Sequence, residues 1–181
     1  MVIHFAYTPE WAHGEAVRAL RQQQRYGREV AFHDVSGDDF AYGRLFARLW
    51  RAGDEFAIVE HDVVVRPDAF DRLDACPSDY CSPNAFCCVR FRSSLIAKHR
   101  DLPEVIGACH WGSLAAEADR VLCERGQRRC TTCTTCDVPS VVHLAYRFRR
   151  EQGLPPIEIV DGQSVVLSTA QKRSRPTRGR A

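Results

Sequence analysis

The chain has 181 residues, of which 45% are hydrophobic and 27% are charged, and its formal net charge is +2. This length suits one domain and excludes two full-sized domains with separate cores, while the apolar fraction excludes a wholly disordered chain. No apolar run is long enough to cross a bilayer and the N-terminal segment lacks the regions of a secretory signal, so we expect a soluble, cytoplasmic protein with reduced thiols.

The first 75 residues alternate between strand and helix patterns. Short β-rich runs predict three strands, at residues 2–7, 28–35 and 55–65. Apolar residues at helical spacing predict three helices, at residues 14–26, 39–53 and 67–75. This order implies an α/β fold with a mostly parallel sheet and helices on both faces.

The second half is less regular. One or two strands, which can be antiparallel, are expected within 80–91, and a short final strand at 155–160. Residues 139–148 suit a strand or a strand that turns into a helix. Helices are expected at 93–102 and 113–125, and an irregular loop at 130–139. We therefore expect a single domain over residues 1–160, followed by a basic, flexible tail over 161–181.

The mild basicity belongs to that tail. Residues 171–181 carry five basic side chains and no acid, which leaves the rest of the chain with a net charge near −3. Such an end is either a solvated, disordered tail or a weak attachment to nucleic acid or to an acidic partner.

Polar residues interrupt or follow each predicted strand of the parallel sheet. They are Tyr7 and Thr8, His33 and Asp34, and the group Glu60, His61 and Asp62. Ligands of such sheets bind beyond the carboxyl ends of the strands, where these positions should converge.

Two of these residues carry the main chemical argument. Glu60 and Asp62 stand two apart in an otherwise apolar strand, and strand alternation puts them on one face with His61 opposite. Two buried like charges need compensation, which a divalent ion such as Mg²⁺ or Mn²⁺ supplies well. The alternative is that the chain is already leaving the core at residue 60 and that both acids are solvated.

Residues 38–73 resemble the stretch around the metal-binding DxD-type motif of GT-A-fold glycosyltransferases, especially family-two-like enzymes. In those enzymes a helix with an arginine and an Ala-Gly-Glu-like turn lead into a hydrophobic strand that ends in the acidic motif. Here Arg44, the turn at 52–54, the FAIV run and Glu60-x-Asp62 occupy these positions. The first acidic position is Glu rather than Asp.

The chain also looks like small glycosyltransferase-like proteins of actinobacteria and their phages. These share an EHD-type motif and a later His-Leu element, here His143 and Leu144. The resemblance implies a three-layer GT-A-like fold, related to the Rossmann fold, with a reduced C-terminal acceptor part. It also implies a transferase that uses a nucleotide-diphospho sugar as donor and Mn²⁺ or Mg²⁺ as cofactor.

The same resemblance assigns expected roles to the donor site. Tyr7, Thr8 and Asp34 would approach the base and ribose of the nucleotide, and Arg44 would lie near its diphosphate. The metal ligands would be Asp62 and Glu60. His143 is the candidate third ligand, since several GT-A enzymes take one from a late histidine; its alternative is a partly buried strand histidine with a backbone partner.

An inverting enzyme also needs a base that deprotonates the acceptor hydroxyl. Glu117 and Asp119 are the acids in the expected region, and because they are two apart on a helix they cannot face the same way. Either of them can instead be solvent-facing. Trp111 would stack on a sugar ring or belong to the core.

The nine cysteines form the other notable pattern. Cys130, Cys133 and Cys136 have the CxxCxxC spacing of a metal or iron–sulfur site, for which Cys123, Cys109 or His143 would supply a fourth ligand. The alternative is a loop of free thiols.

The function expected from the sequence is therefore a metal-dependent glycosyltransferase. A non-catalytic nucleotide-sugar-binding relic or partner subunit is the first alternative, and a cysteine-based zinc or redox protein is the second. The donor sugar, the acceptor (DNA, protein, glycan or small molecule), the anomeric outcome and any homo-oligomer stay open.

Overall fold

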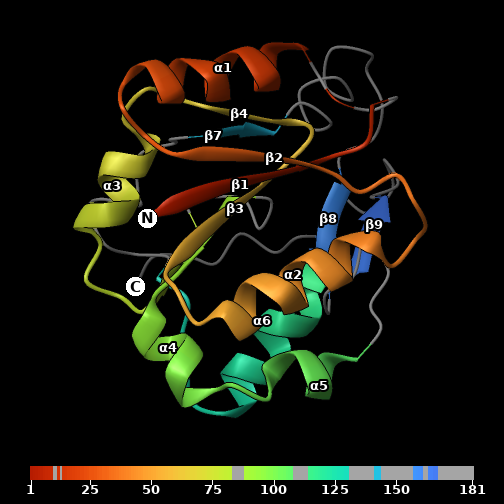
Figure 1. The fold of residues 1–181 in the computed structure, drawn as a ribbon. Coiled ribbons are helices and arrows are strands. Elements are labelled where there is room, and N and C mark those ends of the chain that lie inside the picture. The colour runs from red at the N-terminus through yellow and green to blue at the C-terminus, as the bar shows by residue number, and fades with distance from the viewer. Residues whose placement is uncertain are drawn as a thin grey trace, which may run out of the picture.

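The computed structural model of the chain describes residues 1–9, 12, 14–82, 88–107, 114–130, 141–143, 157–160 and 163–166. Its main sheet has five strands in the order β2-β1-β3-β6-β5 (Figure 1). The strands are β1 (Val2–Tyr7), β2 (Val30–Asp34), β3 (Phe56–Glu60), β5 (Tyr80–Cys81) and β6 (Cys88–Phe91). β1 pairs in parallel with both β2 and β3, whereas β6 is antiparallel to β3 and to β5.

Helices cover both faces of this sheet, as the sequence predicts. On one face lie α2 (Ala41–Ala52), α4 (Ser93–Lys98), α5 (Leu102–Ile106) and α6 (Leu114–Glu124), whose apolar residues form one core cluster with Phe56 and Ile58. On the other face lie α1 (Gly14–Arg25) and α3 (Ala69–Ala75), which pack on Ala57 and Val59. Because neighbouring residues of β3 point to opposite faces, this one strand contributes to both clusters. The three-layer α/β fold is thereby confirmed.

Aromatic packing dominates the core beneath α2. Trp50 is almost fully buried, its ring lies 5.3 Å from that of Phe91, and its indole nitrogen donates to the carbonyl of His99 at 2.8 Å. Gly53 ends α2 in a left-handed conformation, with φ of 83°, which a residue with a side chain rarely adopts. The turn brings the chain directly into β3.

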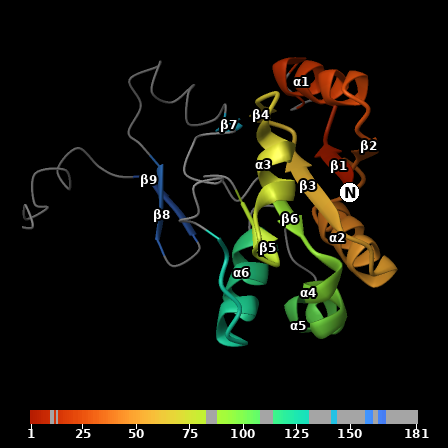
Figure 2. The same cartoon turned by 90° about the vertical axis from the view of Figure 1, so that its left-hand side faces the viewer.

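The single strand predicted at 55–65 is wrong, because the structure divides it into two. β3 ends at Glu60, a turn occupies positions 61 and 62, and β4 (Val63–Val65) then pairs with β7 (Val141–His143) in a second sheet. Val63 and Val65 are buried in the cluster with α1 and α3, so the chain leaves the main sheet to cover its face. Figure 2 shows this β4–β7 pair beside α1.

Two further strands complete the described elements. β8 (Ile157–Val160) pairs antiparallel with β9 (Gln163–Val166) in a third sheet, apart from the main one in Figure 2. β9 falls within the range 161–181 that the sequence assigns to a tail, and residues 167–181 lie outside the described part. No described helix has the length and apolar character needed to cross a membrane.

Candidate functional site

The carboxyl ends of the three parallel strands lie level with one another. Tyr7 pairs with Asp34 across β1 and β2, and Ala6 pairs with Glu60 across β1 and β3. This register brings the ends of β1, β2 and β3 together at one edge of the sheet. Such an edge is where open α/β sheets bind their ligands.

The turn after β3 presents the acidic pair. Glu60, His61 and Asp62 are each half-buried. Strand alternation stops at Glu60, so the prediction that both acids share one strand face, with His61 opposite, is wrong: Glu60 ends β3 and Asp62 lies in the tight turn that follows. The two acids stand two positions apart at the ligand-binding edge, and carboxylate oxygens are ligands that Mg²⁺ prefers.

His143 is brought to this corner by the second sheet. In the antiparallel pair of β4 and β7, His143 is the register partner of Val63, the residue that follows Asp62. The sequence predicts a late histidine on a strand but contains no signal for this pairing, which joins distant parts of the chain. Carboxylates and an imidazole are thereby carried on adjacent backbone segments.

The residues expected at the nucleotide lie on the same edge. Tyr7 is half-buried and stacks on Phe5, with 5.7 Å between ring centroids. The hydroxyl oxygen of Thr8 is buried and has no hydrogen-bond partner in the described part of the chain. Asp34 is exposed; its carboxylate accepts from the backbone nitrogen of Ser36 at 2.9 Å, and hydrogen bonding to Ser36 lowers its pKa.

Arg44 is held at the start of α2 by Asp38. Its two terminal nitrogens donate to the two carboxylate oxygens of Asp38, at 2.7 and 3.1 Å, and both side chains are exposed. Asp38 also accepts from the backbone nitrogen of Phe40 at 2.8 Å, so its carboxylate closes the turn before the helix and its pKa is lowered, mainly by Arg44. A diphosphate at Arg44 would exchange one anionic partner for another.

The two acids of α6 have different surroundings. Glu117 accepts two hydrogen bonds from Arg120, at 2.9 and 3.0 Å, on an exposed side of the helix. Asp119 lies farther in; burial raises its pKa, and the Nε atom of Arg129 lies 3.9 Å from its carboxylate. A carboxylate whose pKa is raised by burial is a stronger proton acceptor than an ordinary aspartate.

Asp119 also lines a small cavity under α6. The cavity has a volume of about 20 Å³, which suits a single water molecule and is far too small for a sugar. Its other walls include Ile58 of β3, Tyr42 of α2 and Tyr80 of β5. Ile58 and Glu60 are two apart on β3, so alternation puts Asp119 on the sheet face toward which Glu60 points.

A pair of histidines lies under α2, and the sequence, which marks His33 as a strand-end residue, does not reveal its pairing with His4. The Nδ1 atom of His4 and the Nε2 atom of His33 lie 2.9 Å apart on neighbouring strands. Burial, His33 and Arg48 lower the pKa of His4 to about 4, and burial and Arg48 also lower the pKa of His33. Both imidazoles are therefore neutral at pH 7. In the sequence, the one indication of this pair is that each histidine lies in a predicted strand.

Trp111, Cys109, Cys133 and Cys136 lie outside the described residues, so the structure does not report on them.

The sequence matches no protein-family model and no curated protein. Solved structures do resemble the fold. A glycosyltransferase involved in the glycosylation of the major capsid of PBCV-1 is 10% identical, with a TM-score of 0.52 over 84% of this chain and 97% of that chain. A Drosophila β-1,4-galactosyltransferase 7 mutant, in complex with manganese, UDP-Gal and xylobiose, is 12% identical, with a TM-score of 0.50 over 99% of this chain and 82% of that chain.

At these identities the likeness concerns the fold. The chain has the GT-A-type fold of glycosyltransferases, which the sequence resemblance predicted.

Proposed function

We propose that the protein is a metal-dependent glycosyltransferase that uses a nucleotide-diphospho sugar. The observation that carries this proposal is the register of β4 and β7, in which His143 stands beside the residue that follows Asp62 at the carboxyl edge of a GT-A-type sheet. Two carboxylates and an imidazole are a donor set that suits Mn²⁺ and, with more water ligands, Mg²⁺.

In this proposal Glu60, Asp62 and His143 hold the ion. A bound divalent ion would neutralise the charge that develops on the leaving nucleoside diphosphate. The manganese and UDP-Gal of the galactosyltransferase 7 complex support the choice of cofactor and donor class. The two carboxylates and the imidazole of this chain also favour Mn²⁺ or Mg²⁺.

The neighbouring residues position the donor and acceptor. Thr8, whose buried hydroxyl lacks a partner in the described chain, hydrogen bonds the nucleoside together with Tyr7 and Asp34. Arg44 pairs with the diphosphate. Asp119 accepts the proton of the acceptor hydroxyl, and its burial favours this role over Glu117, which Arg120 already engages.

The length of the chain is compatible with this activity. The match covers 97% of the PBCV-1 glycosyltransferase and 84% of this chain. Almost all of that enzyme's fold therefore has a counterpart here. This coverage supports the transferase proposal over a non-catalytic relic. Trp111 stays a proposed sugar-stacking residue on sequence grounds.

Calorimetric titration with a panel of nucleoside diphosphates, with and without Mn²⁺, tests the proposal. We expect one or more of them to bind with Mn²⁺ and to lose at least about tenfold in affinity without it. Asp62→Asn should lose that Mn²⁺ dependence, whereas Asp54→Asn, an exposed acid at the opposite end of β3, should retain it.

A turnover assay then distinguishes an active transferase from a non-catalytic relic. Its substrate is the nucleotide sugar of whichever nucleoside diphosphate binds. Release of nucleoside diphosphate that depends on Mn²⁺ and on Asp62 supports the transferase. Binding without any turnover, for every sugar and acceptor supplied, would favour the relic or partner subunit. Absence of binding to all the nucleotides would contradict both.

A further inference from the structure

Three cysteines from separate parts of the chain meet in the core. The sulfur atoms of Cys76, Cys81 and Cys130 all lie within 4.8 Å of one another, and all three residues are buried. Cys76 follows α3, Cys81 belongs to β5, and Cys130 comes after α6. Of the CxxCxxC run, Cys130 is the member that lies among the described residues, and it belongs to this group.

Backbone contacts hold these three positions in place. The backbone nitrogen of Cys130 donates to the carbonyl of Tyr80 at 3.0 Å, and Cys130 forms a parallel β-bridge with Cys81. The backbone nitrogen of Cys76 donates to the carbonyl of Arg72 at 3.1 Å, at the end of α3. The main chain therefore places Cys81 and Cys130 side by side, and the end of α3 fixes the backbone of Cys76.

The spacing of the sulfurs suits a thiolate metal site. A zinc–sulfur bond of about 2.3 Å in tetrahedral geometry separates neighbouring sulfurs by about 3.8 Å, so contraction by about 1 Å would close the site. A disulfide joins only two cysteines, and none of the described cysteines forms one. Three mutually close, buried thiols suit an ion that prefers thiolate ligands, such as Zn²⁺, better than they suit a disulfide bond.

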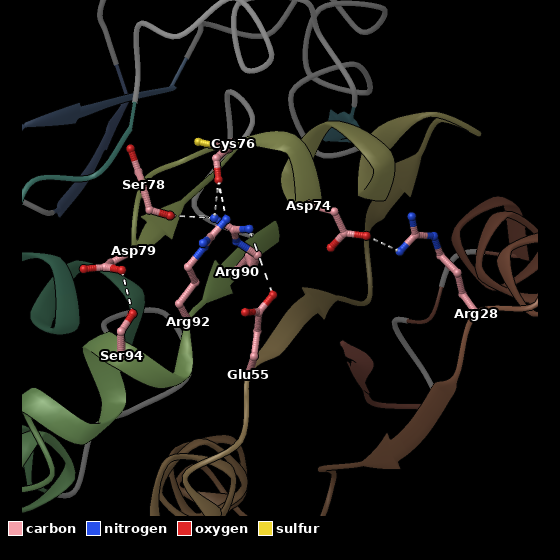
Figure 3. Close-up of polar contacts among 9 residues, drawn as sticks. All are labelled: Arg28, Glu55, Asp74, Cys76, Ser78, Asp79, Arg90, Arg92 and Ser94. Carbon is pink, nitrogen blue, oxygen red and sulfur yellow. Dashed lines mark hydrogen bonds and ion pairs between the residues drawn. The ribbon is translucent and has the colours of Figure 1, made fainter.

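Two arginines contact the backbone of Cys76. Arg90, which is fully buried, donates to the carbonyl of Cys76 at 2.9 Å, and Arg92 donates to the same carbonyl at 2.8 Å (Figure 3). Glu55 is the carboxylate paired with Arg90, at 4.0 Å. These hydrogen bonds fix the main chain at Cys76, one of the three positions that meet in the cluster.

Cys88 is a buried cysteine of the same core that stands apart from the three clustered cysteines. It lies in the same core cluster and is fully buried, but it does not belong to the three-sulfur group. Burial raises the pKa of the Cys88 thiol to about 12, so this side chain behaves as a small apolar residue. It is thereby a matched control for the three clustered cysteines.

We propose that Cys76, Cys81 and Cys130 bind one Zn²⁺ as a structural site. Binding displaces the three thiol protons to solvent and leaves three thiolate–zinc bonds, with a fourth ligand to complete the tetrahedron. The ion ties the segment after α6 to β5 at the edge of the main sheet. This site is independent of the proposed transferase site and uses none of its residues.

Elemental analysis and X-ray absorption of the purified, unaltered protein test the proposal directly. We expect one zinc per chain, with at least three sulfur neighbours at about 2.3 Å. The cobalt-substituted protein should show thiolate-to-cobalt charge transfer and tetrahedral d–d bands. A protein without zinc that also fails to bind cobalt through thiolates would overturn the proposal, as would fewer than three sulfur neighbours.

Variants then assign the ligands. Cys76→Ser, Cys81→Ser and Cys130→Ser should each weaken zinc binding by more than about tenfold. Cys88→Ser, equally buried, and Cys123→Ser, exposed on α6, should bind zinc as the unaltered protein does. Zinc that survives Cys76→Ser and Cys81→Ser but is lost in Cys133→Ser and Cys136→Ser would overturn the proposal, because it would place the ion in the CxxCxxC run.

The site is also separable from the proposed manganese site. Asp62→Asn should keep its zinc, and its thiolate-to-cobalt band should be unchanged. A loss of zinc in Asp62→Asn, with the fold intact by circular dichroism, would contradict the independence of the two sites.

Discussion

His143 is the register partner of Val63, so the β4–β7 pair sets a late histidine beside the acidic turn that ends β3. The contact joins the two halves of the chain at the ligand-binding edge of the main sheet. A single backbone pairing thus connects the GT-A-type fold to the proposed metal chemistry.

Replacement of His143 tests this connection. His143→Ala should weaken Mn²⁺ binding by about tenfold or more, because the ion would lose a nitrogen ligand that fixes its position. The neighbouring variant Val142→Ala, on the same strand, should retain the affinity. Isothermal titration with Mn²⁺ in the presence of nucleoside diphosphate measures both. Equal affinities in the two variants would remove His143 from the ligand set.

Kinetic measurements can distinguish the roles of the two acids of α6, Asp119 and Glu117. Asp119→Asn should lower kcat by about a hundredfold or more with little change in donor affinity, whereas Glu117→Gln should keep most of the activity. Because burial raises the pKa of Asp119, the acidic limb of the pH–rate profile should lie above that of an ordinary aspartate. A profile that is unchanged in Asp119→Asn would show that another group is the base.

The histidine pair predicts a loss of stability in acid. Folded His4, with a pKa of about 4, stays neutral where an unfolded histidine with a pKa of 6.5 takes up a proton. Stability is therefore complete above about pH 6.5 and decreases as the pH falls toward 4. Since His4 is only half-buried, we expect a decrease of about 1 kcal/mol between pH 7 and pH 5.

Urea unfolding at several pH values measures this dependence. The double variant His4→Gln and His33→Gln should show a shallower decrease over the same interval, since neither position can then take up a proton. A decrease as steep as that of the unaltered protein would assign the acid sensitivity to other groups.

Arg90 predicts a large effect on stability. It is fully buried, donates to the carbonyls of Cys76 and Ser78, and lies 4.0 Å from Glu55. Arg90→Met should lower the free energy of unfolding by about 2–4 kcal/mol, because the carbonyls of Cys76 and Ser78 each lose the hydrogen bond from Arg90 and Glu55 loses its cation. Arg100→Met, at an exposed position, should change it by less than about 0.5 kcal/mol. A similar effect in both variants would contradict the role given to Arg90.

Much of the fold could be predicted from local pattern. Apolar residues at helical spacing located α1, α2 and α6 within a few residues, and the strand–helix order implied the parallel arrangement of β1, β2 and β3. The break at positions 61 and 62 could not be predicted, because the valines of β4 continue the apolar pattern of β3. Their burial against α1 and α3, in a different sheet, depends on tertiary packing.

For the candidate site, the sequence alone determined the strand ends that carry Tyr7 and Asp34, because strand order and the carboxyl-edge rule require no knowledge of side-chain contacts. Only the tertiary structure decided the partner of His143, the inward position of Asp119 and the meeting of Cys76, Cys81 and Cys130. These relationships join segments far apart in the chain. Periodicity describes neighbours along one element, whereas the packing of elements decides which distant residues meet.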